Sequence, residues 1–179
     1  SITKDVWFYE AGLLEGKKAL VIGVRDKYSL GAAIAKAFAQ QGAKVGISYE
    51  KEFQRGRILP FADSIGSDFV MRCDVTRDED MTRFFEMAKS KFGNLEILVH
   101  TIAFSWRDEW NYKVYNTSRE GFAQAMDISV RSLLALVEAA MPILAANGSV
   151  LTISHIGSER VTDYKSTGIA PIMGIAKAA

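Results

Sequence analysis

Short apolar runs alternate with longer amphipathic stretches along this chain, and this alternation constrains its fold more than any other feature. The runs are rich in β-branched residues, as in KALVIG at 18–23, which is typical of strands buried on both faces. The stretches between them repeat apolar residues at helical spacing. Alternation of this kind predicts an α/β fold, a doubly wound parallel sheet with helices on both faces.

The order of the predicted elements places candidate ligand-binding residues at one edge of the sheet. Strands are expected at 18–23, 44–49, 68–74, 95–101 and 148–154. Helices are expected at 30–41, 53–65, 78–92 and 119–146. Right-handed crossovers bring the carboxyl ends of all strands to the same edge, where ligands of such sheets bind.

Composition narrows the class of protein. The 179 residues suit one domain, which we place at 13–179 behind a leader at 1–12 that lacks the order of a signal peptide. A net charge of +1 does not favour binding to nucleic acid or an anionic membrane, and no run approaches the ~20 apolar residues of a membrane span. A single cysteine, Cys73, excludes an intramolecular disulfide and fits a reducing, cytoplasmic setting. We interpret Cys73 as a small buried hydrophobic residue.

The first strand leads into the first helix through a loop with two glycines, Gly23 and Gly31. A dinucleotide needs close backbone approach here and N–H groups facing its pyrophosphate. The G-x-G-x-x-G fingerprint is not met, so the loop alone is equally compatible with a plain strand–turn–helix. Ser29 has two interpretations, as helix N-cap or as phosphate donor.

Acidic residues follow the second and third strands. Glu50 lies where a carboxylate would bind ribose hydroxyls and repel a 2′-phosphate, which favours NAD over NADP, although the neighbouring Lys51 weakens this inference. Asp74 and Val75 suit an adenine site, but Asp74 also suits an N-cap for the helix that begins near Arg77.

Small residues follow the fourth strand, at 101–103, and would let a cofactor lie across the sheet. The histidine just before them, His100, is interpreted as a hydrogen-bonded core residue. No Asp, Glu or Cys pattern accompanies the two histidines, so no metal site is predicted.

Several segments carry a resemblance to a known family. In order, they include GKKALVIGV, IAKAFAQQGA, LEILVHTIAF, TSREGF and MGIAKAA. This series resembles the enoyl-[acyl carrier protein] reductase branch of the short-chain dehydrogenases, from residue 13 onward. The resemblance implies a Rossmann-type fold and NADH-dependent reduction of an enoyl-[acyl carrier protein] thioester in type II fatty-acid synthesis. It also implies a homo-oligomer, commonly a tetramer. The cofactor-binding residues that it implies are Gly23, Ser29, Leu30, Glu50, Asp74, Val75, Thr101, Ile102, Ala103, Ile128 and Lys177.

The catalytic tyrosine of this family does not stand where its motif puts it. In the family Tyr-x6-Lys motif the lysine matches Lys177, but Ala170 occupies the tyrosine position. The wider superfamily spacing, Tyr-x3-Lys, falls on Met173, which argues against a carbonyl reductase. Tyr164 and His155 are therefore the two candidates for the catalytic donor beside Lys177. The alternative function is a catalytically impaired NAD-binding relative.

The chain ends two residues after this lysine, whereas the family continues with a mobile substrate-binding segment and two further strands. We therefore expect the C-terminal part of the family fold to be lacking here, either because the chain is a fragment or because its numbering closes over unseen residues.

Overall fold

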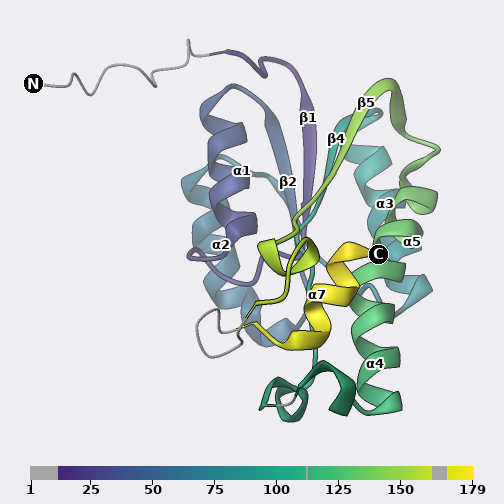
Figure 1. The fold of residues 1–179 in the computed structure, drawn as a ribbon. Helices are drawn as coiled ribbons and strands as arrows, with labels where there is room; N and C mark the ends of the chain where they lie inside the picture. Colours follow the sequence, from purple (N-terminus) through teal and green to yellow (C-terminus); the bar gives the residue numbers. More distant parts are fainter. Residues whose placement is uncertain (1–11, 112, 163–168) are drawn as a thin grey trace, which may run out of the picture.

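Five parallel strands form a single sheet at the centre of the computed structural model, which describes residues 12–111, 113–162 and 169–179. The strand order is β3-β2-β1-β4-β5, with the switch between β1 and β4 (Figure 1). The strands are β1 (Lys18–Ile22), β2 (Lys44–Tyr49), β3 (Phe69–Arg72), β4 (Leu95–His100) and β5 (Leu144–Thr152). The predicted doubly wound parallel fold is confirmed, and β3 is shorter at both ends than the predicted strand.

Helices cover both faces of this sheet. The α-helices of the described residues are α1 (Leu30–Gln40), α2 (Arg55–Ser64), α3 (Asp78–Phe92), α4 (Arg119–Met126), α5 (Ser132–Ala140) and α7 (Pro171–Ala178). Alternate residues of β1 point to opposite sides: Ala19 and Val21 pack with α1 and α2, whereas Leu20 and Ile22 pack with α3 and α5. The strand is buried on both faces because each face meets its own helical layer.

Sequence patterning located the first three helices closely. The helix predicted at 78–92 is α3, and α1 ends one residue before its predicted end. The segment predicted at 53–65 is a 3₁₀ turn, η1 (Glu52–Gln54), followed by α2, which continues through Pro60.

The single helix predicted at 119–146 is wrong in two respects. A π-helical segment, η4 (Asp127–Arg131), separates α4 from α5, and the helix ends at Ala140. Leu144 already pairs with Leu95 of β4, so β5 begins four residues earlier than predicted. A register shift between Leu95 and Ile97 accommodates the extra residues of β5.

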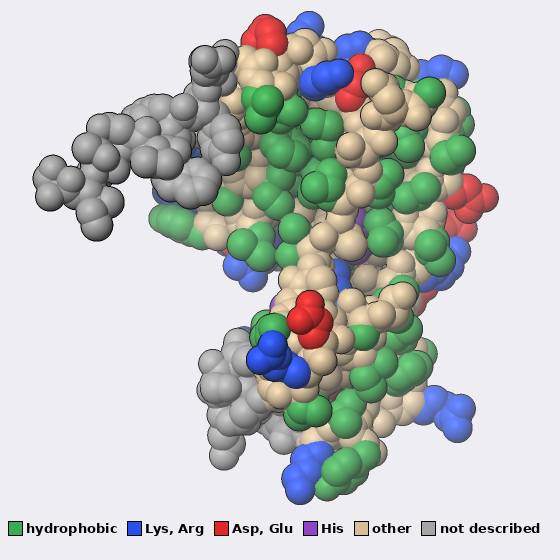
Figure 2. Space-filling view, turned by 45° about the horizontal axis from the view of Figure 1, so that its top comes forward, with side chains coloured by type: hydrophobic (Ala, Val, Ile, Leu, Met, Phe, Trp, Pro, Cys, Tyr) green, Lys and Arg blue, Asp and Glu red, His purple; other side chains and the backbone are tan. Residues whose placement is uncertain are grey.

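The carboxyl ends of the strands form the edge that α7 approaches (Figure 1). At the side of the sheet, the outer strand β5 leaves Val150 and Leu151 exposed, and Leu134 and Met141 are exposed on and just after α5. Figure 2 shows hydrophobic side chains gathered on one face of the molecule. No helix within the described part of the chain has the length and apolar character needed to cross a membrane.

Candidate functional site

The loop between β1 and α1 is fastened to the end of β2. The amide of Gly23 donates to Ser48 Oγ at 3.0 Å, and the amide of Val24 donates to the Ser48 carbonyl at 2.8 Å. Ser48 is fully buried. Gly23 has a φ of +96°, which L side chains rarely adopt, so the turn requires glycine.

The same loop lies directly against the end of β4. A β-carbon at Gly23 would lie 2.6 Å from Ile102 Cγ1, and one at Gly31 would lie 2.7 Å from Thr101 Oγ1. Thr101 Oγ1 in turn donates to the Ile22 carbonyl at 2.8 Å. The structure therefore brings the two glycines of the loop together with two of the predicted cofactor-binding residues.

The N-terminus of α1 opens toward this loop. Ser29 is its N-cap, since Ser29 Oγ accepts from the Ala32 amide at 3.3 Å, which confirms the capping interpretation. Leu30 is 67% exposed at the first helical position. Asp26 turns the loop by accepting from the Tyr28 amide, and this hydrogen bond and the Arg25 guanidinium lower the pKa of its carboxyl group.

At the ends of β2 and β3 the predicted acidic residues are accessible. Glu50 is exposed and lies 3.6 Å from Lys51 Nζ, while its amide donates to the buried Gln54. Asp74 is half-buried, and Asp74 Oδ1 accepts from both the amide and the hydroxyl of Thr76. The N-cap interpretation of Asp74 is wrong, because the residue before α3 is Arg77 and makes no side-chain cap.

Next to Asp74, an ion pair between the partly exposed Arg72 and the buried Asp80 fixes the end of β3. Asp80 Oδ2 lies 2.6 Å from an Arg72 guanidinium nitrogen and also accepts from the Asp74 amide at 3.3 Å. Val75, the other predicted adenine-site residue, is buried. This arrangement holds the Asp74 backbone in place while leaving its second carboxylate oxygen for a ligand.

His100 is a core residue, as predicted. It is fully buried, with Nε2 2.8 Å from Ser132 Oγ and Nδ1 2.8 Å from Thr152 Oγ1. The Ser132 hydroxyl donates its one proton to the Ile128 carbonyl at 2.6 Å, so His100 Nε2 must donate and Nδ1 accepts. Burial, followed by the charge of Lys177, lowers the pKa of His100 to about 4.

Helix α7 brings Lys177 to the end of β4. Lys177 Nζ donates to the Ile102 carbonyl at 2.9 Å, and burial lowers the pKa of Lys177. The backbone of Lys177 is held as well, because Ser154 Oγ, just after β5, donates to the Lys177 carbonyl at 3.3 Å. The predicted lysine therefore reaches the same point of the sheet as Gly23.

The loop after Ile102 is held by the π-helical segment. Ala103 is exposed, and the next residue, Phe104, exchanges hydrogen bonds of 3.0 and 3.2 Å through its amide and carbonyl with Ser129 Oγ. Ile128 is half-buried in that segment. The extra residue of a π-turn is a common feature of functional sites, and here it turns Ser129 toward the loop.

Both positions that a family tyrosine would occupy hold buried apolar side chains. Ala170 packs with Ala125 and Ile172, and Met173 is 6% exposed. Tyr164 lies outside the described residues. His155, the other candidate donor, accepts a hydrogen bond from the Gly157 amide through Nδ1 at 3.0 Å.

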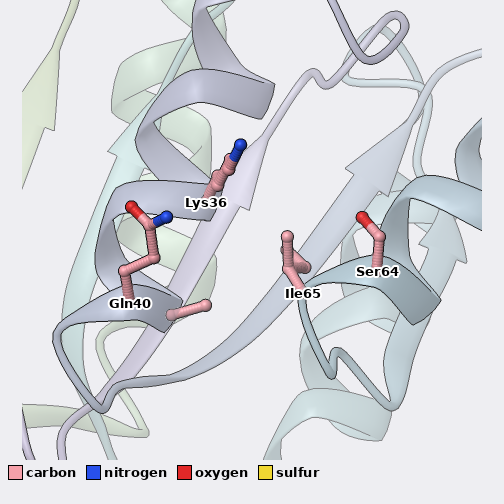
Figure 3. A pocket seen from close by; sticks show the side chains of 5 residues that line it. Lys36, Gln40, Ser64 and Ile65 are labelled. Carbon is pink, nitrogen blue, oxygen red and sulfur yellow. The ribbon is translucent and has the colours of Figure 1, made fainter.

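Among the described residues, no group of three or more His, Cys, Asp or Glu side chains could hold a metal ion. A hollow of about 240 Å³ lies between the C-terminal ends of α1 and α2 (Figure 3). Because α1 begins at the carboxyl edge of the sheet, this hollow lies at the opposite edge, away from Lys177. Its lining residues are Lys36, Ala39, Gln40, Ser64 and Ile65.

Comparison with known proteins agrees with this geometry. Residues 23–179 match the family model described as enoyl-(acyl carrier protein) reductase. The chain belongs to this family. The enoyl-[acyl-carrier-protein] reductase [NADH] of Aquifex aeolicus is 41% identical over 94% of the chain, and enoyl-[acyl-carrier-protein] reductase [NADH] 1 of Rhizobium meliloti is 35% identical over 94%.

Solved structures of the reductase family superpose closely on the fold. The Aquifex aeolicus enzyme gives a TM-score of 0.88 at 41% identity. The superposition covers 94% of this chain and 65% of the Aquifex chain. The Anaplasma phagocytophilum reductase, solved in complex with NAD, gives a TM-score of 0.88 at 36% identity. The superposition covers 94% of this chain and 63% of the Anaplasma chain. This chain spans 61% and 60% of the length of the Aquifex and Rhizobium relatives.

Three positions that shape the site were not among the predicted site residues. They are Ser48, which holds the Gly23 turn, Gly31, which meets Thr101, and Ser129, which holds Phe104. A serine within the buried strand run KVGISY is a signal that could have found Ser48, because a buried hydroxyl needs a partner. Ser129 carried no such signal, since the π-turn that orients it was not predicted.

Proposed function

We propose that the protein reduces the carbon–carbon double bond of an enoyl thioester carried on acyl carrier protein, with NADH as hydride donor, in type II fatty-acid synthesis. The observation that carries this proposal is the contact of Lys177 Nζ with the Ile102 carbonyl, beside the Gly23 turn. This contact brings Lys177, which matches the lysine of the family motif, to the end of β4, where the cofactor is expected to bind. The similar proteins of Aquifex and Rhizobium are named NADH-dependent enoyl reductases.

The residues at this edge fit a dinucleotide. Gly31 leaves no space for a β-carbon beside Thr101, so the first turn of α1 packs directly against the end of β4. That turn supplies N–H groups without intrahelical partners, which suits a pyrophosphate. Glu50 and Asp74 present carboxylate oxygens to ribose and adenine groups, and Val75 flanks the adenine position. This set of donors and acceptors matches the chemistry of NADH from adenine to nicotinamide.

On the nicotinamide side, Lys177 is the main polar group. One N–H of its ammonium group donates to the Ile102 carbonyl, which leaves two N–H groups for ribose hydroxyls. The backbone of residues 101–103 would lie under the nicotinamide ring. Ile128, which precedes Ser129 in the π-helical segment, would lie near it. When bound, NADH supplies the hydride for the β-carbon of the enoyl thioester, and negative charge then develops on the thioester oxygen. A hydrogen-bond donor from the protein must stabilise that oxygen.

The second candidate function is that of an NAD-binding relative without reductase turnover. The observation that favours it is the buried apolar character of Ala170 and Met173, which leaves both tyrosine positions without a donor. The sequence offers Tyr164 and His155 as replacements, and the two functions differ only in whether one of them acts.

Partners and setting follow from the same proposal. The acyl carrier protein would deliver the substrate in the cytoplasm. We further propose a homo-oligomer, with a tetramer expected from the family, in which the exposed apolar residues after and within α5, Leu134 and Met141, become covered. Light scattering on the purified protein measures this state directly, and a monomer at micromolar concentration would contradict it.

The deciding experiment measures NADH oxidation with crotonyl thioester, on this chain and on the longest natural form of the protein. Reductase turnover in either form supports the first function. NADH binding in both forms without any turnover supports the second. Failure of both forms to bind NADH would contradict the two functions together.

A further inference from the structure

His155 has a hydrogen-bond donor that the described part of the protein leaves unused. The residue follows β5, and its Nδ1 accepts from the Gly157 amide at 3.0 Å. Because an amide can only donate, the neutral ring must carry its proton on Nε2. That nitrogen is buried and has no hydrogen-bond partner among the described residues. The ring is thus fixed as an Nε2–H donor without an acceptor.

The contrast with His100 shows that this arrangement is specific to one position. Both ring nitrogens of His100 have hydroxyl partners at 2.8 Å. A buried donor without an acceptor destabilises the folded protein, so structures rarely keep one without a use. An acceptor oxygen brought by a ligand would remove this cost.

The loop that carries His155 is built to hold the ring at this place. A β-carbon at Gly157 would lie 2.5 Å from His155 Cε1, so only glycine lets the imidazole fold over its own turn. A β-carbon at Gly174 would lie 2.7 Å from the Gly157 carbonyl oxygen, so α7 also packs tightly on this turn. Gly174 and Lys177 are three residues apart in α7 and therefore lie on neighbouring surface positions of the helix. The turn with His155 and the helix with Lys177 form one packed unit at the carboxyl edge.

We infer that His155 donates its Nε2–H to the thioester carbonyl oxygen of the substrate, in place of the phenol that Ala170 cannot supply. This inference rests on the proposed reductase function. Hydride adds to the β-carbon, the electrons of the double bond move toward the carbonyl, and the oxygen becomes an enolate oxygen. NADH is oxidised to NAD⁺, and the α-carbon then takes a proton from water. His155 keeps its own proton throughout and acts by stabilising the negative oxygen.

The test compares His155→Phe, which removes the donor but keeps a planar ring, with His155→Gln, which returns an N–H near the position of Nε2. Loss of one oxyanion donor lowers kcat by about 100-fold or more, so His155→Phe is expected to lose this much at an unchanged Kd for NADH. His155→Gln should recover at least about 10-fold of that loss. An Nε2-protonated ring in the ¹⁵N NMR spectrum of the wild-type protein is the expected result that does not depend on turnover.

Different outcomes separate this inference from the proposed function. If the wild-type protein turns over and His155→Phe retains its kcat, the inference is overturned and the reductase function stands. A proton on Nδ1, or a larger loss in Tyr164→Phe than in His155→Phe, also overturns it. If the wild-type protein binds NADH but never oxidises it with crotonyl thioester, the proposed function fails and the inference fails with it.

Discussion

The amine of Lys177 lies 2.9 Å from the carbonyl oxygen of Ile102, a residue 75 positions earlier in the chain. This contact connects the last helix to the end of β4, at the place where the Gly23 turn touches Ile102. The half-buried amine has two further N–H groups beside the backbone of this strand end, and these are suited to bind hydroxyl groups of a ligand. The contact therefore brings the amine of α7 to the proposed cofactor site.

Replacing Lys177 with methionine tests this relation. Methionine keeps much of the apolar stem but removes every donor of Nζ, so the Kd for NADH should rise by about 10-fold or more, as expected for lost hydrogen bonds to a charged group. Fluorescence titration with NADH measures the change. The matched control is Lys36→Met on α1, at the opposite edge of the sheet, which should leave the Kd unaltered. Equal affinity of Lys177→Met and the wild-type protein would contradict the assignment.

Gly31 provides a second test, through packing. In Gly31→Ala the new methyl group would meet Thr101 Oγ1 at 2.7 Å, so the loop must move away from β4. We expect the free energy of unfolding to fall by about 1–3 kcal/mol and NADH binding to weaken. Denaturant unfolding and NADH titration measure the two effects.

The chain offers a matched control for this substitution. Gly56, in α2, has nothing within 4 Å of its β-carbon position. Gly56→Ala should be neutral or raise the stability by up to about 1 kcal/mol, because alanine favours a helix over glycine. If both variants behave alike, close approach at Gly31 is not what the site requires.

The order and type of most elements were predictable from the sequence because β1 to β4 are short runs made mainly of apolar residues. The prediction failed at 141–146, where Ala145 and Ala146 favour a helix by local propensity. Pairing of Leu144 with Leu95 of the neighbouring strand decides the structure there, and this long-range contact leaves no local mark. The same limit applied to the site. The sequence pattern predicted residues at the strand ends, such as Gly23 and Thr101, but not the contacts that these residues make between strands.

Cys73 tests the interpretation of the lone cysteine as a structural residue. Burial first, and the nearby carboxylates of Asp80 and Asp74 next, raise the pKa of its thiol to about 12. At pH 8 the thiolate is therefore scarce as well as covered, and alkylation of the native protein should be ~100-fold slower or more than that of the unfolded chain. Mass spectrometry after timed exposure to iodoacetamide measures both rates. Rapid modification of the native protein would show that Cys73 is accessible.

His100 predicts a loss of stability at acidic pH. Its folded-state pKa of about 4 lies below the ordinary histidine value of about 6.5, because burial and Lys177 disfavour the charged ring. Between these values the unfolded chain binds a proton that the folded protein does not, so stability falls as the pH falls from about 6.5 to about 4. The loss should reach about 3 kcal/mol, with the full contribution present above pH 6.5.

Denaturant unfolding at a series of pH values measures this slope. His100→Gln removes the titrating ring and should flatten the curve between about pH 4 and 6.5, although it lowers stability at neutral pH by disturbing Ser132 and Thr152. The control is His155→Gln at the chain's other histidine, which keeps the His100 slope. An undiminished slope in His100→Gln would mean that another group binds the proton, and the buried network of His100 would then not be the origin of the acid sensitivity.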